Sequence, residues 1–439
     1  MIPPEVIGFF KKEGGHSLIV KGEPGSGKTT FALEILSVLK NDFEVKYVST
    51  RIADDVLFLQ FPWLKELFER KIEKKEEKKI SREELNRLEG LIEEGFLEEK
   101  VKFEEGGAVL EVGAMLPEME DIYDFVESVH PKVALICIDS IDGLSEKYGI
   151  PAEKILYTLQ KDLVEKGNAN MIFILENAGF ENIEYLGDGV ISLHHEPWDG
   201  YWKRYMYIQK LRGAPIKNSK YIYTLHEGHF NALKYEPFSL DSLSEINLRD
   251  LEEYVKKVMK YRVVNFIIDP EFPPELIGVF FLSIIKNSQG TPLILPSSGY
   301  PGDLIKRNVE KFIGRDIKLA GFRNQGGDIV LEGRDMLIEL SRDIISYHIG
   351  KDSLVILGID TLGDLYGDLR DLPRLIENAK REHRVILFTP KDYPKLQGNI
   401  GVERKVFLES MENIPVIRDV GELNAIVEKE GGIKLIPLM

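Results

Sequence analysis

Short apolar runs alternate with amphipathic segments along the first half of the chain. The runs are rich in Val, Ile and Leu, which is typical of strands buried on both faces of a parallel sheet. We therefore predict an α/β domain in which helices cover a parallel sheet. The predicted strands are Ser17–Lys21, Val45–Ser49, Ala108–Val112, Val133–Asp139, Asn170–Leu175 and Val190–Leu193.

The pattern changes after the last of these strands. Two segments, Tyr201–Leu211 and Tyr221–Leu225, are separated by a Gly/Pro turn and predict an antiparallel extension of the sheet. Between the second and third predicted strands lies a charged insertion at about residues 62–105. Pro62 can begin one helix and Ser81-Arg-Glu-Glu84 is a capping box for another, so we expect a helical hairpin. The hairpin is either a solvated decoration or a lid or partner-docking arm.

The second half repeats the order of elements found in the first. Its predicted strand, loop, helix and strand over Val263–Pro296 mirror Ser17–Ser49, and the run Ser353–Asp360 mirrors Val133–Asp139. Such self-similarity indicates a duplicated domain. The predicted division is a first domain over 1–240, a linker over 241–262 with a helix from about Leu248 to Met259, and a second α/β domain over 263–439.

One loop of the first half has the sequence of a phosphate-binding loop, G-x-x-x-x-G-K-[ST]. It lies between a predicted strand and a predicted helix, as such a loop must; a chance glycine-rich turn is the alternative. The glycines let amides converge on a phosphate, and the start of the helix adds its dipole. Lys28 would reach the β- and γ-phosphates, and the Thr29 hydroxyl would bind Mg²⁺. The predicted nucleotide-binding residues are Gly22, Glu23, Pro24, Gly25, Ser26, Gly27, Lys28, Thr29 and Thr30.

The end of a later strand adds a second part to this site. Asp139 ends the apolar run Leu135-Ile-Cys-Ile-Asp139, a form that holds Mg²⁺ through water. Any buried strand can end in Asp, but downstream of a phosphate-binding loop the pattern indicates a site for ATP and Mg²⁺. The second half has Asp269-Pro-Glu-Phe-Pro-Pro274 at the place of the loop. Its prolines supply no amide and its carboxylates would repel a phosphate, so we predict a pseudo-ATPase domain.

Composition and charge argue against several classes of protein. The chain of 439 residues has 57 Lys and Arg against 73 Asp and Glu, which gives a net charge of −16. This acidic excess argues against a protein that grips nucleic acid, though not against a local basic patch. The sequence has no apolar run of about 18 residues and no signal pattern at its start, so we expect a cytoplasmic protein without membrane contact. The single cysteine, Cys137, excludes an internal disulfide.

The order of elements resembles the RecA superfamily, most closely the branch of the ATPase KaiC. The resemblance is carried by the loop Gly22–Thr30, the strand Ile136–Ser140 and the segment Gln209-Lys-Leu-Arg-Gly213. KaiC-like proteins have a similar K-x-R-G, whose Lys and Arg point across a subunit interface at the neighbour's γ-phosphate. The resemblance therefore implies that Lys210 and Arg212 act on a neighbouring subunit. A basic edge strand is the alternative reading of these two residues.

The segments from Phe9 to Gly22 and from Tyr47 to Arg51 look similar to the GvpD family of archaeal gas-vesicle regulators. This resemblance covers about the first 235 residues. If it extends to the role of the family, it implies a transcriptional regulator as the protein partner.

One departure from the KaiC pattern concerns hydrolysis. KaiC-like ATPases usually end the second strand in a pair of glutamates that orient the attacking water, whereas this chain has Val48-Ser-Thr-Arg51. Either Asp54, Asp55 or Glu176 takes their place, or hydrolysis is slow, which we favour. Losing a positioned base typically costs roughly 10²–10⁴-fold in rate. Arg51 would bind the γ-phosphate as a sensor or pair with a surface carboxylate.

Three functions follow from these observations. The leading one is a regulatory ATPase whose second domain relays the nucleotide state to a protein partner; the others are a non-catalytic ATP-binding scaffold and a DNA-handling ATPase. Head-to-tail contacts of RecA-like ATPases suggest a homo-hexamer, while a fused copy that mimics a neighbour would leave a monomer or dimer. We assign no metal to His226 and His229 or to His194 and His195, which lack further ligands in register.

Overall fold

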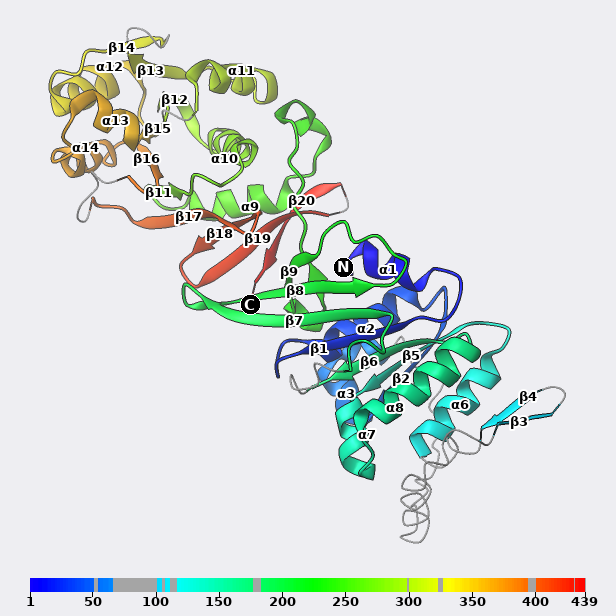
Figure 1. Ribbon diagram of the computed structural model, residues 1–439. Helices are drawn as coiled ribbons and strands as arrows, with labels where there is room; N and C mark the ends of the chain where they lie inside the picture. Colours follow the sequence, from blue (N-terminus) through cyan, green and yellow to red (C-terminus); the bar gives the residue numbers. More distant parts are fainter. Residues whose placement is uncertain are drawn as a thin grey trace. The chain divides into compact units, whose positions relative to one another are not determined.

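The computed structural model describes residues 1–50, 54–65, 101–104, 107–110, 117–176, 183–297, 300–322, 327–393, 400–429 and 431–438. The chain divides into two compact units, Met1–Ala232 and Leu233–Leu438. Each unit contains one large sheet with helices on its faces (Figure 1).

The first unit is built on an eight-stranded sheet in the order β10-β9-β8-β7-β1-β6-β5-β2. Strands β2, β5, β6, β1 and β7 are parallel, and β8, β9 and β10 extend the sheet in antiparallel fashion. The strands are β1 (Ser17–Gly22), β2 (Glu44–Ser49), β5 (Ala134–Asp139), β6 (Asn170–Leu175), β7 (Gly189–Trp198), β8 (Tyr201–Leu211), β9 (Lys220–Thr224) and β10 (Asn231–Ala232).

Helices cover both faces of this sheet because successive strand residues point to opposite sides. Leu18 and Val20 pack with α1 and α2 on one face, whereas Ile19 packs with α6, α7 and α8 on the other. The strands are thus buried on both faces, which accounts for their continuous hydrophobicity. The helices are α1 (Pro4–Phe10), α2 (Lys28–Leu39), α3 (Asp54–Gln60), α6 (Pro117–Val129), α7 (Ile141–Tyr148) and α8 (Ala152–Leu159).

The predicted parallel strands and the antiparallel extension are confirmed, with one exception. The run at Ala108–Val112 does not join the large sheet. Instead β4 (Gly107–Leu110) pairs only with β3 (Val101–Glu104) in a separate two-stranded hairpin. Most of the predicted helical hairpin at 62–105 lies outside the described residues.

The second unit has a ten-stranded sheet in the order β14-β13-β12-β15-β16-β11-β17-β18-β19-β20. Its eight strands from β12 to β20 follow the same order as β2-β5-β6-β1-β7-β8-β9-β10, and the change from parallel to antiparallel falls at the same place. Strands β13 and β14 are added at the edge beyond β12. The predicted second α/β domain is confirmed, and it repeats the strand order of the first.

The bounds of the second unit's strands are β11 (Val263–Ile268), β12 (Gln289–Leu295), β13 (Lys318–Phe322), β14 (Ile329–Leu331), β15 (Ser353–Gly358), β16 (Arg384–Pro390), β17 (Arg404–Met411), β18 (Ile414–Asp419), β19 (Glu422–Lys429) and β20 (Gly432–Pro437). Its helices are α9 (Arg249–Val258), α10 (Pro274–Lys286), α11 (Gly302–Phe312), α12 (Ser346–His348), α13 (Ile359–Tyr366) and α14 (Leu372–Ala379). Helices α9, α10 and α11 pack on one face of the sheet, and α13 and α14 on the other.

Two details of the predicted organisation differ in the structure. The helix expected in the linker is α9, whose Leu251, Val255 and Val258 are buried in the core of the second unit. The pairing of Asp360 with Asp139 is wrong. Asp139 ends strand β5, whereas Asp360 is the second residue of helix α13, as Asp142 is of α7.

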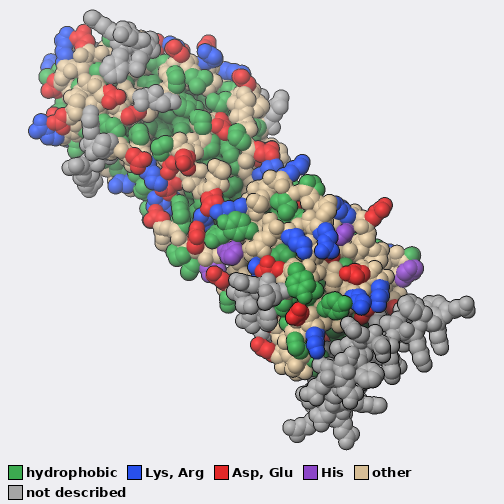
Figure 2. Space-filling view, in the orientation of Figure 1, with side chains coloured by type: hydrophobic (Ala, Val, Ile, Leu, Met, Phe, Trp, Pro, Cys, Tyr) green, Lys and Arg blue, Asp and Glu red, His purple; other side chains and the backbone are tan. Residues whose placement is uncertain are grey.

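The surface of each unit mixes charges of both signs. On the face drawn in Figure 2, Lys and Arg side chains lie among Asp and Glu side chains. Within the described ranges, no helix combines the length and the apolar character needed to cross a bilayer.

Candidate functional site

The loop between β1 and α2 is a tight turn that depends on glycine at two positions. A Cβ on Gly22 would lie 2.3 Å from the carbonyl oxygen of Leu193 on β7. Gly27, at the N-terminus of α2, has a left-handed φ of 89°, and a Cβ there would meet the Leu225 side chain at 2.7 Å. Neither position admits a side chain without displacing its neighbours. The glycines of the predicted phosphate-binding loop are therefore required by the packing of the loop against β7 and Leu225.

Lys28 is the first residue of α2 and folds back into the loop. Its buried Nζ donates hydrogen bonds to the carbonyl oxygens of Gly22 (2.7 Å) and Glu23 (3.0 Å). Burial lowers the pKa of the Lys28 ammonium, while the carboxylates of Glu176 and Asp139 oppose this shift. A phosphate oxygen would offer Lys28 a charged acceptor in place of two neutral ones, and such hydrogen bonds are roughly twice as strong.

Thr29 and Asp139 meet next to this lysine. The Thr29 hydroxyl donates to Asp139 Oδ2 at 2.6 Å, and the Tyr47 hydroxyl donates to the same oxygen at 2.8 Å. Asp139 is almost fully buried, with 9% of its surface exposed. A hydroxyl and a carboxylate oxygen at this separation are hard oxygen donors of the kind Mg²⁺ prefers. The residues present therefore fit a Mg²⁺ site.

The end of β2 carries no carboxylate among the described side chains that could orient water. After Ser49, the Thr50 hydroxyl accepts from the Ser140 amide (3.0 Å) and donates to the Asp139 carbonyl (3.2 Å), so it holds the backbone of the neighbouring strand end. Arg51 and the side chains of Asp54 and Asp55 lie outside the described residues.

Glu176 directly follows β6, the strand between β1 and β5. Its amide donates to Asp142 Oδ2 at 2.7 Å, and its carboxylate is the largest charge contribution that stabilises the Lys28 ammonium. The sequence analysis did not identify Asp142 or Tyr47 as part of this site. Asp142 is 1% exposed and is the second residue of α7, three residues after Asp139.

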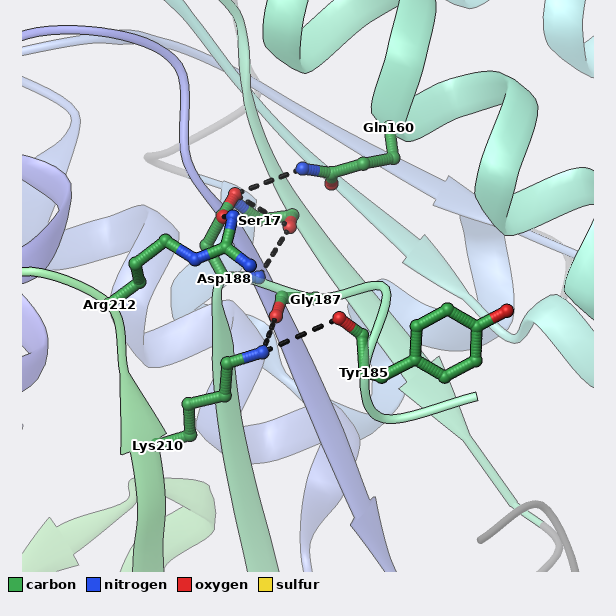
Figure 3. Close-up of polar contacts among 7 residues, drawn as sticks. All are labelled: Ser17, Gln160, Tyr185, Gly187, Asp188, Lys210 and Arg212. Atoms are coloured by element: carbon green, nitrogen blue, oxygen red, sulfur yellow. Dashed lines mark hydrogen bonds and ion pairs between the residues drawn. The ribbon is translucent and has the colours of Figure 1, made fainter. Parts of the chain in front are cut away.

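Lys210 and Arg212 lie at the opposite end of the sheet from the loop of their own chain. Lys210 pairs in register with Val190, which pairs with Ile19, three steps or roughly 10 Å before the last residue of β1. Arg212 contacts Asp188, which is bonded to Ser17 at the start of β1, five steps or roughly 17 Å before the loop. Figure 3 shows both side chains directed at residues 185–188. Both cations are therefore directed toward the end of the sheet opposite the loop of their own chain.

The histidines named in the sequence analysis make local contacts. His229 lies 3.0 Å from Glu34 of α2 and stacks on Trp63, and His194 stacks on Tyr205. In the part of the chain that the structure describes, no group of three His, Cys, Asp or Glu residues could hold a metal ion.

The corresponding edge of the second unit carries different charges. Asp269 directly follows β11, as Glu23 follows β1, and it pairs at 3.0 Å with Lys391, which directly follows β16, as Glu176 follows β6. Helix α10 begins with Pro274 where α2 begins with Lys28. Lys391 also lies 3.0 Å from Glu409, which Arg418 contacts through two nitrogens. Burial opposes the ionisation of Glu409, but the two cations outweigh it and lower the pKa. Phe272 of the same loop is buried in the core, so side chains of the unit fill this edge.

Comparison with known proteins agrees with this geometry. Residues 6–209 match the family described as the GvpD gas vesicle protein, P-loop domain. GvpD1 and GvpD2 of Halobacterium salinarum are each 24% identical over 333 and 350 residues, covering 69% and 68% of this chain. The chain spans 58% and 62% of the length of these relatives. A KaiC-like protein from Pyrococcus horikoshii OT3 is 20% identical with a TM-score of 0.35, covering 50% of this chain and 90% of its own.

The first unit is thus an α/β domain that resembles the P-loop domain of GvpD. The alignments with GvpD1 and GvpD2 cover more of the chain than the first unit contains, so they extend the resemblance beyond the first 235 residues.

Proposed function

We propose that this protein is a regulatory ATPase that binds Mg-ATP in its first unit and hydrolyses it slowly. The convergence of Lys28, Thr29 and Asp139 beside the glycine loop carries the proposal. Lys28 and the loop amides would hold the phosphates of ATP, and Thr29 and Asp139 would hold Mg²⁺. The metal supplies neutralisation of the phosphate charge when it is bound.

Slow hydrolysis is supported by the side chains that lie where the usual glutamate pair would orient water. Thr50 stands near the place of the glutamate pair and is engaged with the backbone of Asp139 and Ser140. Among the described side chains, Glu176 is the carboxylate best situated to accept a proton from an attacking water. Its position is fixed through the hydrogen bond from its amide to Asp142. We assign it the role of general base, at a rate below that of an enzyme with the usual glutamates.

Assembly completes the proposed site. Because the side chains of Lys210 and Arg212 are directed at Gly187 and Asp188, at the end of the sheet opposite the loop of their own chain, we propose that they reach the γ-phosphate bound to a second copy. A head-to-tail contact of this kind produces a ring such as a hexamer when the rotation closes, and a dimer is the smaller alternative.

The second unit would relay the state of the first to a protein partner. Its edge is filled by Phe272 and the Asp269–Lys391 pair, which supports a role other than nucleotide binding. The resemblance to GvpD suggests a cytoplasmic transcriptional regulator as the partner. Small-angle scattering of the full chain with and without Mg-ATP tests the relay. We expect a nucleotide-dependent change in the profile that Lys28→Ala abolishes, and identical profiles would count against it.

Steady-state ATP turnover is the direct test of the enzyme. The wild-type chain and Lys40→Ala, an exposed lysine just after α2, should turn over ATP alike, whereas Lys28→Ala should be inactive. ATP binding without turnover in the wild type would favour a second function, a non-catalytic ATP-binding scaffold. This second function is supported by Thr50, whose hydroxyl bonds to the backbone and does not replace the carboxylates that would orient water.

A further inference from the structure

Asp188 is a buried carboxylate that joins three elements of the first unit. Its Oδ2 accepts hydrogen bonds from the Ser17 amide (3.3 Å), the Ser17 hydroxyl (3.2 Å) and Gln160 Nε2 (3.0 Å). Its own amide donates to the Ser17 hydroxyl at 3.0 Å. Ser17 begins β1, and Gln160 begins the π-helical segment Gln160–Lys166 that continues α8. The carboxylate is therefore held rigidly from one side.

The other oxygen of this carboxylate holds Arg212. Arg212 Nη1 donates to Asp188 Oδ1 at 2.7 Å, and the Arg212 amide donates to the Asp188 carbonyl oxygen at 2.8 Å (Figure 3). The Arg212 side chain is 64% exposed, whereas that of Asp188 is 9% exposed. Since a guanidinium has five N–H donors and Asp188 engages one nitrogen, most of the group faces solvent.

Lys210 is held by the same loop. Its Nζ donates to the carbonyl oxygen of Gly187 at 2.6 Å and approaches that of Tyr185 at 3.5 Å. Lys210 is near the end of β8 and Arg212 directly follows the strand, and both side chains contact the loop 185–188. The loop 185–188 thus fixes both cations of the K-x-R segment. Among the described residues of this loop, Asp188 supplies the carboxylate that contacts them.

We propose that Asp188 is a positioning residue. It holds Arg212 directly and Lys210 through the loop 185–188, in the conformation in which both cations meet the nucleotide bound to a second copy. This inference rests on the proposed action of the two cations across an interface. An unanchored arginine would lose rotamer freedom each time it met a phosphate, whereas an anchored one has lost it beforehand. Because Asp188 is bonded to the first residue of β1 and the phosphate loop follows the last, one strand connects the two functions.

Mixing two inactive chains tests the inference. Arg212→Ala keeps its nucleotide site but lacks the arginine, and Lys28→Ala keeps the arginine but lacks a working site. Together they should regain ATP turnover if the arginine acts in trans. Adding Asp188→Asn to the Lys28→Ala chain should lower the kcat of the mixture by roughly ten- to a hundredfold, as for a displaced catalytic group. The KM for ATP should not change, since the nucleotide site belongs to the other chain.

A matched control separates positioning from stability. Asp162→Asn in the Lys28→Ala chain removes another shielded carboxylate, which pairs with Lys166 in the same segment, and should leave the mixture fully active. Ser17→Ala in that chain removes one donor to Asp188 and should lower kcat several-fold, so it replaces Asp188→Asn if that chain does not fold.

The outcomes distinguish the two levels of the proposal. Full activity from a folded Asp188→Asn chain, or from Ser17→Ala if Asp188→Asn does not fold, overturns the positioning role. Failure of the parent mixture to regain turnover, while the wild type remains active, overturns the action in trans instead.

Discussion

Replacing Asp139 by Asn should remove the Mg²⁺ dependence of ATP binding while leaving the fold in place. The carboxylate oxygen accepts hydrogen bonds from Thr29 and Tyr47, and an amide oxygen can accept from the same hydroxyls. The amide lacks the negative charge that attracts a hydrated Mg²⁺. Asp139→Asn therefore changes the charge at the site with little change in the packing of β5.

The magnitude follows from the indirect contact of Asp139 with the metal. Loss of a group that holds a metal through its ligands typically costs about 10- to 100-fold in affinity, or about 1.4–2.7 kcal/mol. At an ATP concentration of about 1,000 times Kd, ligand binding stabilises the wild type by about 4.1 kcal/mol, and the variant would keep about 1.4–2.7 kcal/mol. Each kcal/mol moves the melting temperature of a unit this size by about 2–4 °C. The variant should lose roughly 3–10 °C of the ATP-induced rise.

Calorimetric titrations of ATP in Mg²⁺ and in EDTA, followed by melting curves, measure both quantities. The wild type and Asp124→Asn, which changes an exposed carboxylate of α6, should bind ATP more tightly in Mg²⁺. Asp139→Asn should bind with similar affinity in the two buffers. An undiminished gain from Mg²⁺ in Asp139→Asn would refute the assignment of this carboxylate to the metal.

Three further predictions concern the base, the loop and acid stability. Glu176→Gln should lower kcat by roughly 100-fold with little change in ATP affinity; unchanged turnover would remove Glu176 as the base. Gly27→Ala should abolish ATP binding measured by calorimetry, because its φ of 89° and the nearby Leu225 side chain oppose a Cβ; wild-type affinity would contradict this. Burial lowers the pKa of His383, so the unfolded state takes up its proton first and the free energy of unfolding should fall as the pH drops below about 6.5. Denaturant titrations at pH 7.5 and 5.5 should show a smaller fall in His383→Gln than in the wild type, and equal falls would exclude this histidine.

The sequence predicts those features whose information is local. The glycines of the loop, Lys28 and Thr29 lie within one short segment, and the doubly buried strands are visible as apolar runs. The run at Ala108–Val112 looks the same, yet β4 pairs only with β3, because an apolar run does not specify its partner strand. The offset between Asp139 and Asp360 has a similar cause, since a run does not show at which residue a strand becomes a helix.

Contacts between distant segments could not be predicted in this way. The hydrogen bond from Tyr47 to Asp139 spans 92 residues, and that from Ser17 to Asp188 spans 171. A serine at the start of an apolar strand carries no sign of the carboxylate that it will meet. These pairings arise only when the strand order brings the two ends together, so a single sequence contains the residues but not their neighbours.

The different charges at the corresponding edges of the two sheets should make the stability of the two units depend differently on ATP. A bound ATP would contact Lys28, and at about 100 times its Kd it would add about 2.7 kcal/mol to the stability of the first unit. Lys391 and Arg418 balance the carboxylates of Asp269 and Glu409 without any ligand. As ATP is depleted, the first unit should become more susceptible to proteases, while the second remains as resistant as before. One polypeptide would then contain a unit whose stability reports the ATP concentration and a unit whose stability does not change with it.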